Sequence, residues 1–255
     1  MQAAPRIATK ATVFKLKNRN LFMLKQNLIS RNPLRSVENA NGDIIAEGEF
    51  GGVLSRAGVG KTALVVQLAL NSMLRGTQVL HISLNDSIEK VTLWYREQFQ
   101  NLAGECTIAE RQELWETILP YRFIMTFRVT KFSVPKLEER LTDLIEQDVF
   151  HPSMIIIDGL VFDETGNAQL KELKTLAMKY HLQMWFTVHT HREEDTTSSG
   201  IPVRLISAFD LFDVALELKS QGAEVHIVAL KGPQIKGSDT KLSLDPATML
   251  IKDSL

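Results

Sequence analysis

The residues best suited to chemistry form one short loop between an apolar run and a helix-forming run. This loop reads Ser-Arg-Ala-Gly-Val-Gly-Lys-Thr over residues 55–62. Gly58 and Gly60 allow backbone N–H groups to form a concave ring at the positive end of the helix, which favours an anion. Lys61 would add a mobile positive charge for the outer phosphates, and the Thr62 hydroxyl can ligate Mg²⁺. The strand, loop and helix order predicts a site for a polyphosphate.

The loop departs from the usual pattern at its first position, where Ser55 stands in place of glycine. A small residue is tolerable there if its φ stays negative. We therefore keep the whole loop as the expected nucleotide site. The residues expected to contact the nucleotide are Ser55, Arg56, Ala57, Gly58, Val59, Gly60, Lys61, Thr62 and Ala63.

A carboxylate follows another apolar run, Met154–Ile157, which is apolar on both faces and is expected to be a central strand. Asp158 stands at the carboxyl end of this run, where it would hold Mg²⁺ through water. The alternative is that Asp158 caps a following helix. Together with Thr62, Asp158 makes up the predicted magnesium site.

The elements that must position these residues are those of an α/β fold. With 44% hydrophobic and 23% charged residues, the 255-residue chain has the composition of a globular protein, which excludes disordered and fibrous classes. Crossover-length segments separate the first five apolar runs, so a mainly parallel sheet flanked by helices is expected. These strands are predicted over Phe50–Leu54, Val79–Leu84, Phe123–Phe127, Met154–Ile157 and Met184–Val188.

The spacing of the apolar runs changes after residue 210, where short runs are separated only by turn-like segments. This spacing predicts a C-terminal antiparallel β-meander. Between the parallel part and the meander, the polar segment 192–200 is expected to be a mobile loop. The predicted meander strands are Val214–Leu218, Val225–Leu230, Lys241–Leu244 and Met249–Ile251.

Residues 1–37 are chemically distinct, with eight basic residues and no acidic one. We expect a basic N-terminal arm or leader over 1–37 and one domain over 38–255. Such an arm can bind a polyanion such as single- or double-stranded DNA, or it can be a solvated leader or a strap on a neighbouring subunit. The single Cys106 fits a reducing compartment, so a cytoplasmic protein without a membrane span is expected.

The order of these motifs resembles that of the RecA-like P-loop ATPases, closest to the KaiC, RadA and DnaB-type branch. The resemblance spans about residues 40–253 and includes a closing meander in which a Lys-containing turn precedes an Asp-Pro pair. It identifies a superfamily better than an individual member. The segments that carry it are the 55–62 loop, His81–Leu84, Ile155–Asp158, Trp185–His189 and the hairpin Val225–Asp245.

The resemblance implies ATP and Mg²⁺ as ligands and an oligomeric ring or filament as the active form. Lys61 would act on the phosphates, and His189 would sense the γ-phosphate, with His191 as an alternative and a packing role as the competing interpretation. Lys231 or Lys236 would reach the γ-phosphate of a neighbouring subunit, unless they are solvated turn lysines.

The main departure from the family pattern follows the second strand, where the usual catalytic Glu is replaced by Asn85-Asp86. An amide cannot accept a proton, and Asp86 is shorter than Glu, so slow hydrolysis is expected. A capping box with Asp86 at the N-cap and Glu89 three residues later is an equally good interpretation. The chain is thus expected to be an ATPase motor or switch acting on DNA, or alternatively a nucleotide-gated KaiC-like signalling or binding module; a kinase-type reaction is disfavoured.

Overall fold

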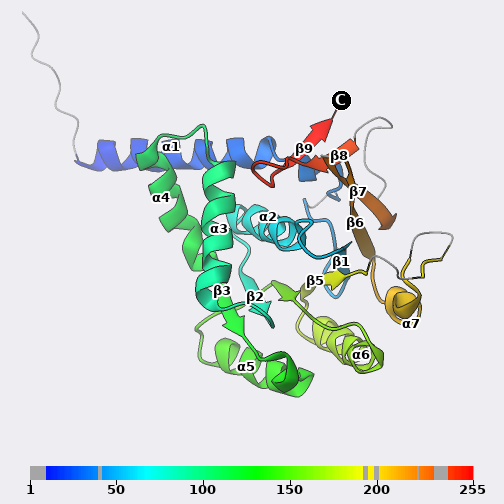
Figure 1. Cartoon of the computed structure of the whole chain (residues 1–255). Helices are drawn as coiled ribbons and strands as arrows, with labels where there is room; N and C mark the ends of the chain where they lie inside the picture. The colour runs from blue at the N-terminus through cyan, green and yellow to red at the C-terminus, as the bar shows by residue number, and fades with distance from the viewer. Residues whose placement is uncertain are drawn as a thin grey trace, which may run out of the picture.

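The computed structural model describes residues 10–39, 42–191, 195–197, 201–222, 224–232 and 241–254. Within these residues, nine strands form a single sheet in the order β3-β2-β4-β5-β1-β6-β7-β8-β9. Helices lie on both sides of the sheet (Figure 1). The strands are β1 (Phe50–Ser55), β2 (Val79–Ser83), β3 (Arg122–Thr126), β4 (Met154–Asp158), β5 (Gln183–His189), β6 (Val214–Gln221), β7 (Glu224–Lys231), β8 (Lys241–Leu244) and β9 (Ile251–Ser254).

The described part of the chain also contains seven α-helices and four 3-10 turns; α1 and η1 precede the first strand. The α-helices are α1 (Lys10–Ser30), α2 (Lys61–Leu74), α3 (Ile88–Leu102), α4 (Ile108–Ile118), α5 (Val134–Glu146), α6 (Glu164–Lys179) and α7 (Ile206–Phe209). The 3-10 turns are η1 (Pro33–Ser36), η2 (Leu119–Tyr121), η3 (Val129–Lys131) and η4 (Val203–Leu205).

The expected division of the sheet is confirmed. Strands β3, β2, β4, β5, β1 and β6 pair in parallel, and β6, β7, β8 and β9 continue the same sheet in antiparallel pairs. The chain is therefore an α/β protein with a mostly parallel central sheet and C-terminal antiparallel strands. No helix in the described ranges is both long and apolar enough to cross a bilayer.

Two details differ from the sequence prediction. Strand β4 is interior, but the middle of the sheet is occupied by β1. The last strand begins at Ile251 instead of Met249, because Met249 has a φ of 56° and belongs to the preceding turn. Part of the predicted mobile loop, residues 192–194 and 198–200, lies outside the described residues, whereas Thr196 forms an isolated antiparallel bridge with Pro202.

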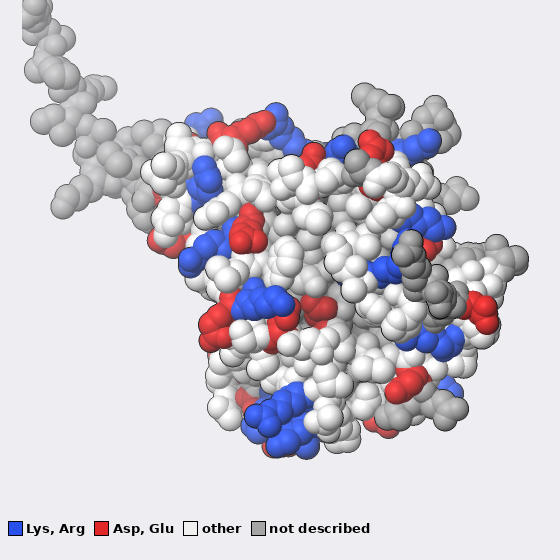
Figure 2. Space-filling model, viewed as in Figure 1, with Lys and Arg blue, Asp and Glu red and all other residues white. Residues whose placement is uncertain are grey.

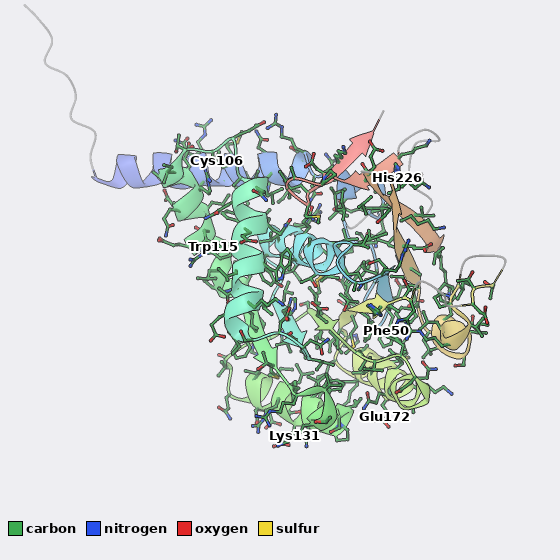
Figure 3. All side chains as sticks on the ribbon, in the orientation of Figure 1. Phe50, Cys106, Trp115, Lys131, Glu172 and His226 are labelled. Carbon is green, nitrogen blue, oxygen red and sulfur yellow. The ribbon has the colours of Figure 1, made fainter. Side chains whose placement is uncertain are left out.

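The alternation of side chains along each strand divides the core into two layers. In β4, Ile156 packs in the layer beneath α2, α3 and α4, whereas Ile155 and Ile157 pack in the layer beneath α5, α6 and α7. All three side chains are fully buried, as expected of a strand covered on both faces. In the second layer, the ring centroids of Phe50 in β1 and Phe186 in β5 lie 4.8 Å apart. Figure 3 labels Phe50 among the side chains of the domain.

The N-terminal segment is attached to the domain at its C-terminal end. Leu34 and Val37 are core residues, 1% and 2% exposed, and Leu28 packs against the same core layer. Figure 1 shows the other end of α1 extending beyond the body of the domain. The chemically distinct segment 1–37 thus includes residues that the fold buries.

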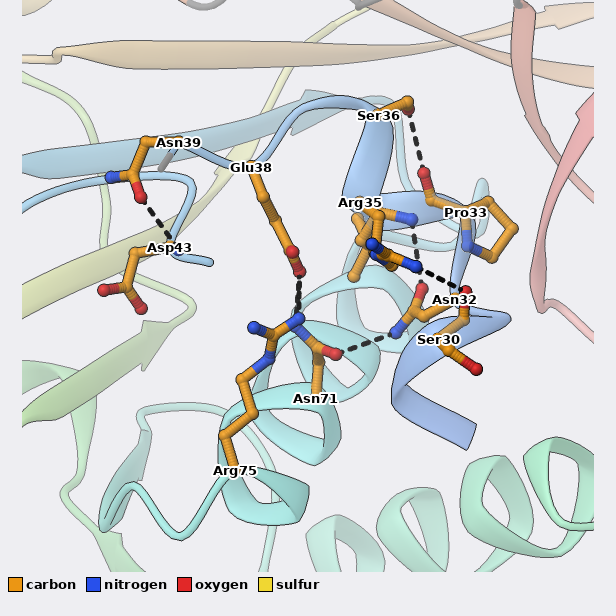
Figure 4. A network of polar contacts seen from close by, with 11 residues as sticks. Ser30, Asn32, Pro33, Arg35, Ser36, Glu38, Asn39, Asp43, Asn71 and Arg75 are labelled. Atoms are coloured by element: carbon orange, nitrogen blue, oxygen red, sulfur yellow. Dashed lines mark hydrogen bonds and ion pairs between the residues drawn. The ribbon is translucent and has the colours of Figure 1, made fainter. Parts of the chain in front are cut away.

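A polar network holds this junction in place (Figure 4). Glu38 accepts hydrogen bonds from Arg75 Nη2 at 2.7 Å and from Asn71 Nδ2 at 3.1 Å. Asn32 donates to the Asn71 side-chain oxygen at 3.1 Å. Glu38 is only 6% exposed, so these donors take the place of the water that burial excludes from its side chain.

Helix α2 is tied to the last strand through Gln67. Its side-chain nitrogen donates to the Met249 carbonyl at 2.7 Å, and its side-chain oxygen accepts from the Ile251 N–H at 2.8 Å. This buried amide therefore joins the first helix after the 55–62 loop to the C-terminal meander.

Candidate functional site

The parallel strands place several predicted site residues at one edge of the sheet. Strands β1, β4 and β5 run in the same direction and end at Ser55, Asp158 and His189. Strand β5 lies between β1 and β4, and Ser55 is paired with His189. Carboxyl ends of parallel strands form the usual ligand-binding crevice of open α/β sheets.

The 55–62 loop has the backbone conformation that its glycines suggest. Gly58 has a φ of 77° and Gly60 a φ of 119°, and Gly60 is the N-cap of α2. A Cβ atom at Gly60 would also lie 3.0 Å from Cδ1 of Leu244. Among the described residues, only Asp148, His181 and Met249 combine a side chain with a positive φ, so Ser55 meets the condition for replacing glycine.

Lys61 is held over the loop by main-chain oxygens. Its ammonium group donates to the Ser55 carbonyl at 2.8 Å and to the Arg56 carbonyl at 2.9 Å. Burial lowers the Lys61 pKa to about 8, while the negative charge of Asp158 opposes this shift. Hydrogen bonds therefore fix the position of the Lys61 ammonium group, and the charge of Asp158 only partly offsets the effect of burial on it. Both features suit a phosphate contact.

Asp158 lies at the centre of a hydroxyl network. The Thr62 hydroxyl donates to Oδ2 at 3.0 Å, and the Thr187 hydroxyl donates to Oδ1 at 2.5 Å. The Gly159 N–H in turn donates to Thr187 Oγ1 at 3.0 Å. Burial raises the Asp158 pKa, and the two hydroxyl groups oppose this shift.

The donor set around Asp158 fits a magnesium ion. A carboxylate and the Thr62 hydroxyl are hard oxygen ligands, and Mg²⁺ is usually held by one or two such groups together with water and phosphate oxygens. Within the described residues no group of three or more His, Cys, Asp or Glu side chains could hold a metal.

A cavity of about 350 Å³ lies at the carboxyl ends of β4 and β5. It contains two of the predicted residues on the phosphate side, Lys61 and Asp158, and the predicted sensor His189. The remaining lining residues are Asn85, Gly159, Leu160, Val161, Phe162, Thr187, His191 and Arg204.

Asn85, and not Asp86, lines the cavity. Asp86 is bound instead by Lys90 Nζ at 2.8 Å, although its charge still raises the Asp158 pKa. The predicted capping box is wrong, because the N-cap of α3 is Ser87, whose hydroxyl accepts the Lys90 N–H. The Asp86 N–H donates to Ser83 Oγ at 3.0 Å, whereas the predicted capping box would use this N–H for the Glu89 carboxylate.

The remaining candidates have different surroundings. His189 and His191 are exposed, with ring centroids 4.7 Å apart, and both line the cavity. The Lys231 ammonium group makes contacts within its own chain. It donates to the Asp210 carbonyl at 3.2 Å and lies 5.8 Å from the centre of the Phe209 ring. Lys236 lies outside the described residues.

Sequence reasoning missed several of the lining residues, among them the polar Thr187 and Arg204 and the apolar Leu160, Val161 and Phe162. Thr187 had a usable signal, because it is two residues before His189 on the same strand and alternation places both side chains on one face. Arg204 had none, since it lies in the short turn η4 and follows no recognisable motif. Its guanidinium group donates to the His189 carbonyl.

Comparison with known proteins adds no family assignment. No protein-family model matches the chain, and no curated protein matches it.

Proposed function

We propose that this chain binds ATP with Mg²⁺ as a RecA-like P-loop ATPase. The observation that carries the proposal is the hydrogen bond between Thr62 and Asp158, 3.0 Å long, which joins the helix after the glycine loop to the end of β4. These are the two groups expected to share a magnesium ion, although β5 lies between β4 and β1, the strand that precedes the glycine loop. The sheet order and the antiparallel C-terminal strands support the same family.

The expected roles follow from the positions of the side chains. The backbone N–H groups of the 55–62 loop would bind the β-phosphate at the positive end of α2, and Lys61 would contact the outer phosphates. Thr62 and Asp158 would hold Mg²⁺, which supplies charge neutralisation of the phosphate oxygens when it is bound. His189 lines the cavity beyond Lys61, where it would contact the terminal phosphate or a water molecule.

One observation favours a nucleotide-gated switch over a rapid motor. Asp158 is the only carboxylate among the described residues that line the cavity, and it already accepts two hydroxyl hydrogen bonds. Asn85 can orient a water molecule but cannot take its proton. We therefore propose slow hydrolysis, with DNA binding through the basic N-terminal segment and assembly into an oligomer as further proposals.

Isothermal titration calorimetry with Mg-ATP tests nucleotide binding directly. We expect micromolar affinity for the full-length protein and at least tenfold weaker binding for Lys61→Ala. The matched control is Lys171→Ala, which removes an exposed lysine on α6. Absence of heat at millimolar ATP or GTP with folded protein contradicts the proposal, and phosphate release measured on the same samples separates a motor from a switch.

A further inference from the structure

A second cation lies at the same cavity as Lys61. Arg204, in η4, lines the cavity together with Asp158 and His189. Its guanidinium group donates to the main-chain carbonyl of His189, at the end of β5. No part of the proposed phosphate site described so far uses this residue.

The two cationic side chains are hydrogen-bonded to two residues that pair with each other across neighbouring strands. Lys61 donates to the Ser55 carbonyl, Arg204 donates to the His189 carbonyl, and Ser55 and His189 are partners in the parallel register of β1 and β5. Neighbouring strands are about 4.8 Å apart. The two positive groups are therefore fixed on adjacent strand ends at one edge of the sheet.

The main chain around Arg204 is also held firmly. Leu205 is 1% exposed and packs in the core layer that includes α6 and α7. Asn167 of α6 donates to the Arg204 carbonyl at 3.4 Å and to Ser207 Oγ at 3.1 Å. Packing and hydrogen bonds thus set the position of this arginine within its own chain.

We infer that Arg204 contacts the terminal phosphate of a bound nucleoside triphosphate from within the same chain, opposite Lys61. This inference rests on the proposed nucleotide site. A guanidinium group can bind phosphate oxygens through two parallel N–H groups, whereas a diphosphate would leave this end of the cavity without an anion. Arg204 therefore sets the preference for triphosphate over diphosphate, and this preference does not require a neighbouring subunit.

The first experiment compares the affinities for Mg-ATP and Mg-ADP. We expect Arg204→Ala to weaken ATP binding at least tenfold and ADP binding less than threefold, with Arg204→Lys intermediate because charge remains but the planar fork is lost. Arg204→Gln retains a donor for the His189 carbonyl and serves as the variant to use if Arg204→Ala unfolds. Arg140→Ala, which removes an exposed arginine on α5, is the matched control.

The second experiment tests whether the contact is made within one chain. Arg204→Ala protein is mixed with Lys61→Ala protein, and tight ATP sites are counted by titration. A contact within one chain leaves the mixture without tight sites, whereas a contact from a neighbour restores some of them and overturns the inference. An unchanged ratio of ATP to ADP affinity in Arg204→Ala also overturns it, while failure of the unmodified protein to bind either nucleotide refutes the proposed function itself.

Discussion

The Thr187 hydroxyl lies 2.5 Å from Oδ1 of Asp158, across the neighbouring strands β5 and β4. This hydrogen bond stabilises the charged form of a carboxylate whose burial raises its pKa. The Thr187 hydroxyl thereby opposes the effect of burial on the carboxylate that we propose as a magnesium ligand.

Replacing Thr187 with Val should weaken Mg²⁺-dependent nucleotide binding about tenfold, the lower end of the effect of losing a residue that orients a metal ligand. Thr187→Ser keeps the hydroxyl and should bind as the unmodified protein does. Titration of ATP at several Mg²⁺ concentrations measures the effect. Equal magnesium dependence in the Val and Ser variants would show that the hydroxyl does not support the site.

Nucleotide affinity should fall as pH rises through about 8, the lowered pKa of Lys61. A phosphate binds the charged ammonium form, and that form is lost above this pKa; the terminal phosphate is already ionised in this range, since its last pKa is about 6. Calorimetry between pH 7.5 and 9.5 measures the change. Affinity that stays constant over this interval would mean that Lys61 remains charged or does not contact the phosphate.

Glu38→Ala should lower the free energy of unfolding by about 2 kcal/mol, because it leaves Arg75 and Asn71 without an acceptor at a mostly buried position. Glu105→Ala is the control, since Glu105 pairs with Arg31 at the surface, where both side chains are mainly exposed. That pair should contribute less than about 0.5 kcal/mol. Urea denaturation of both variants gives the comparison, and equal losses would contradict a structural role for the buried network.

The fold should lose stability in acid because of His81. This fully buried side chain contacts the Tyr95 hydroxyl at 3.1 Å through Nδ1, and burial lowers its pKa to about 3, with a smaller contribution from Arg122. The unfolded chain binds a proton below pH about 6.5 that the folded chain does not. Stability should therefore decrease as pH falls from 6.5 towards 3, by up to about 1.4 kcal/mol per pH unit.

His81→Gln should reduce the dependence of the free energy of unfolding on pH by the equivalent of about one bound proton. Urea denaturation at several pH values measures this change. His151→Gln is the matched control, because its side chain is half exposed near the start of β4. If both variants keep the original slope, the acid sensitivity arises from other groups.

A test of DNA binding should remove residues 2–18 and leave residues 19–37 in place, since Leu34 and Val37 belong to the core. The deletion eliminates Arg6, Lys10, Lys15 and Lys17. If these four contact single-stranded DNA, the slope of log affinity against log salt should decrease by about 3. An unchanged slope would exclude this segment as the DNA-binding element. Figure 2 shows charges of both signs interspersed over most of one face of the molecule, with one compact basic group at its lower end.

Much of the sheet could be predicted because each strand is a short apolar run bounded by turn residues, and the glycine loop followed from its own spacing. The position of β5 between β1 and β4 could not, since side-chain periodicity carries no information on strand order. The start of α3 was misplaced because Asp86 and Ser87 are both good caps and the sequence does not distinguish them; in the structure Ser87 is the N-cap. Arg204 reached the cavity through tertiary packing of η4, for which no local pattern exists.

Gln67 joins the C-terminal meander to α2, the helix that follows the glycine loop. Its two hydrogen bonds join α2 to the turn before β9, and a Cβ atom at Gly60 would lie 3.0 Å from Leu244 Cδ1 of β8. A rotation of α2 that accompanied a change at the loop would therefore act on the edge of the sheet farthest from β3. A fluorophore attached beyond β9 would report on the loop without entering the cavity.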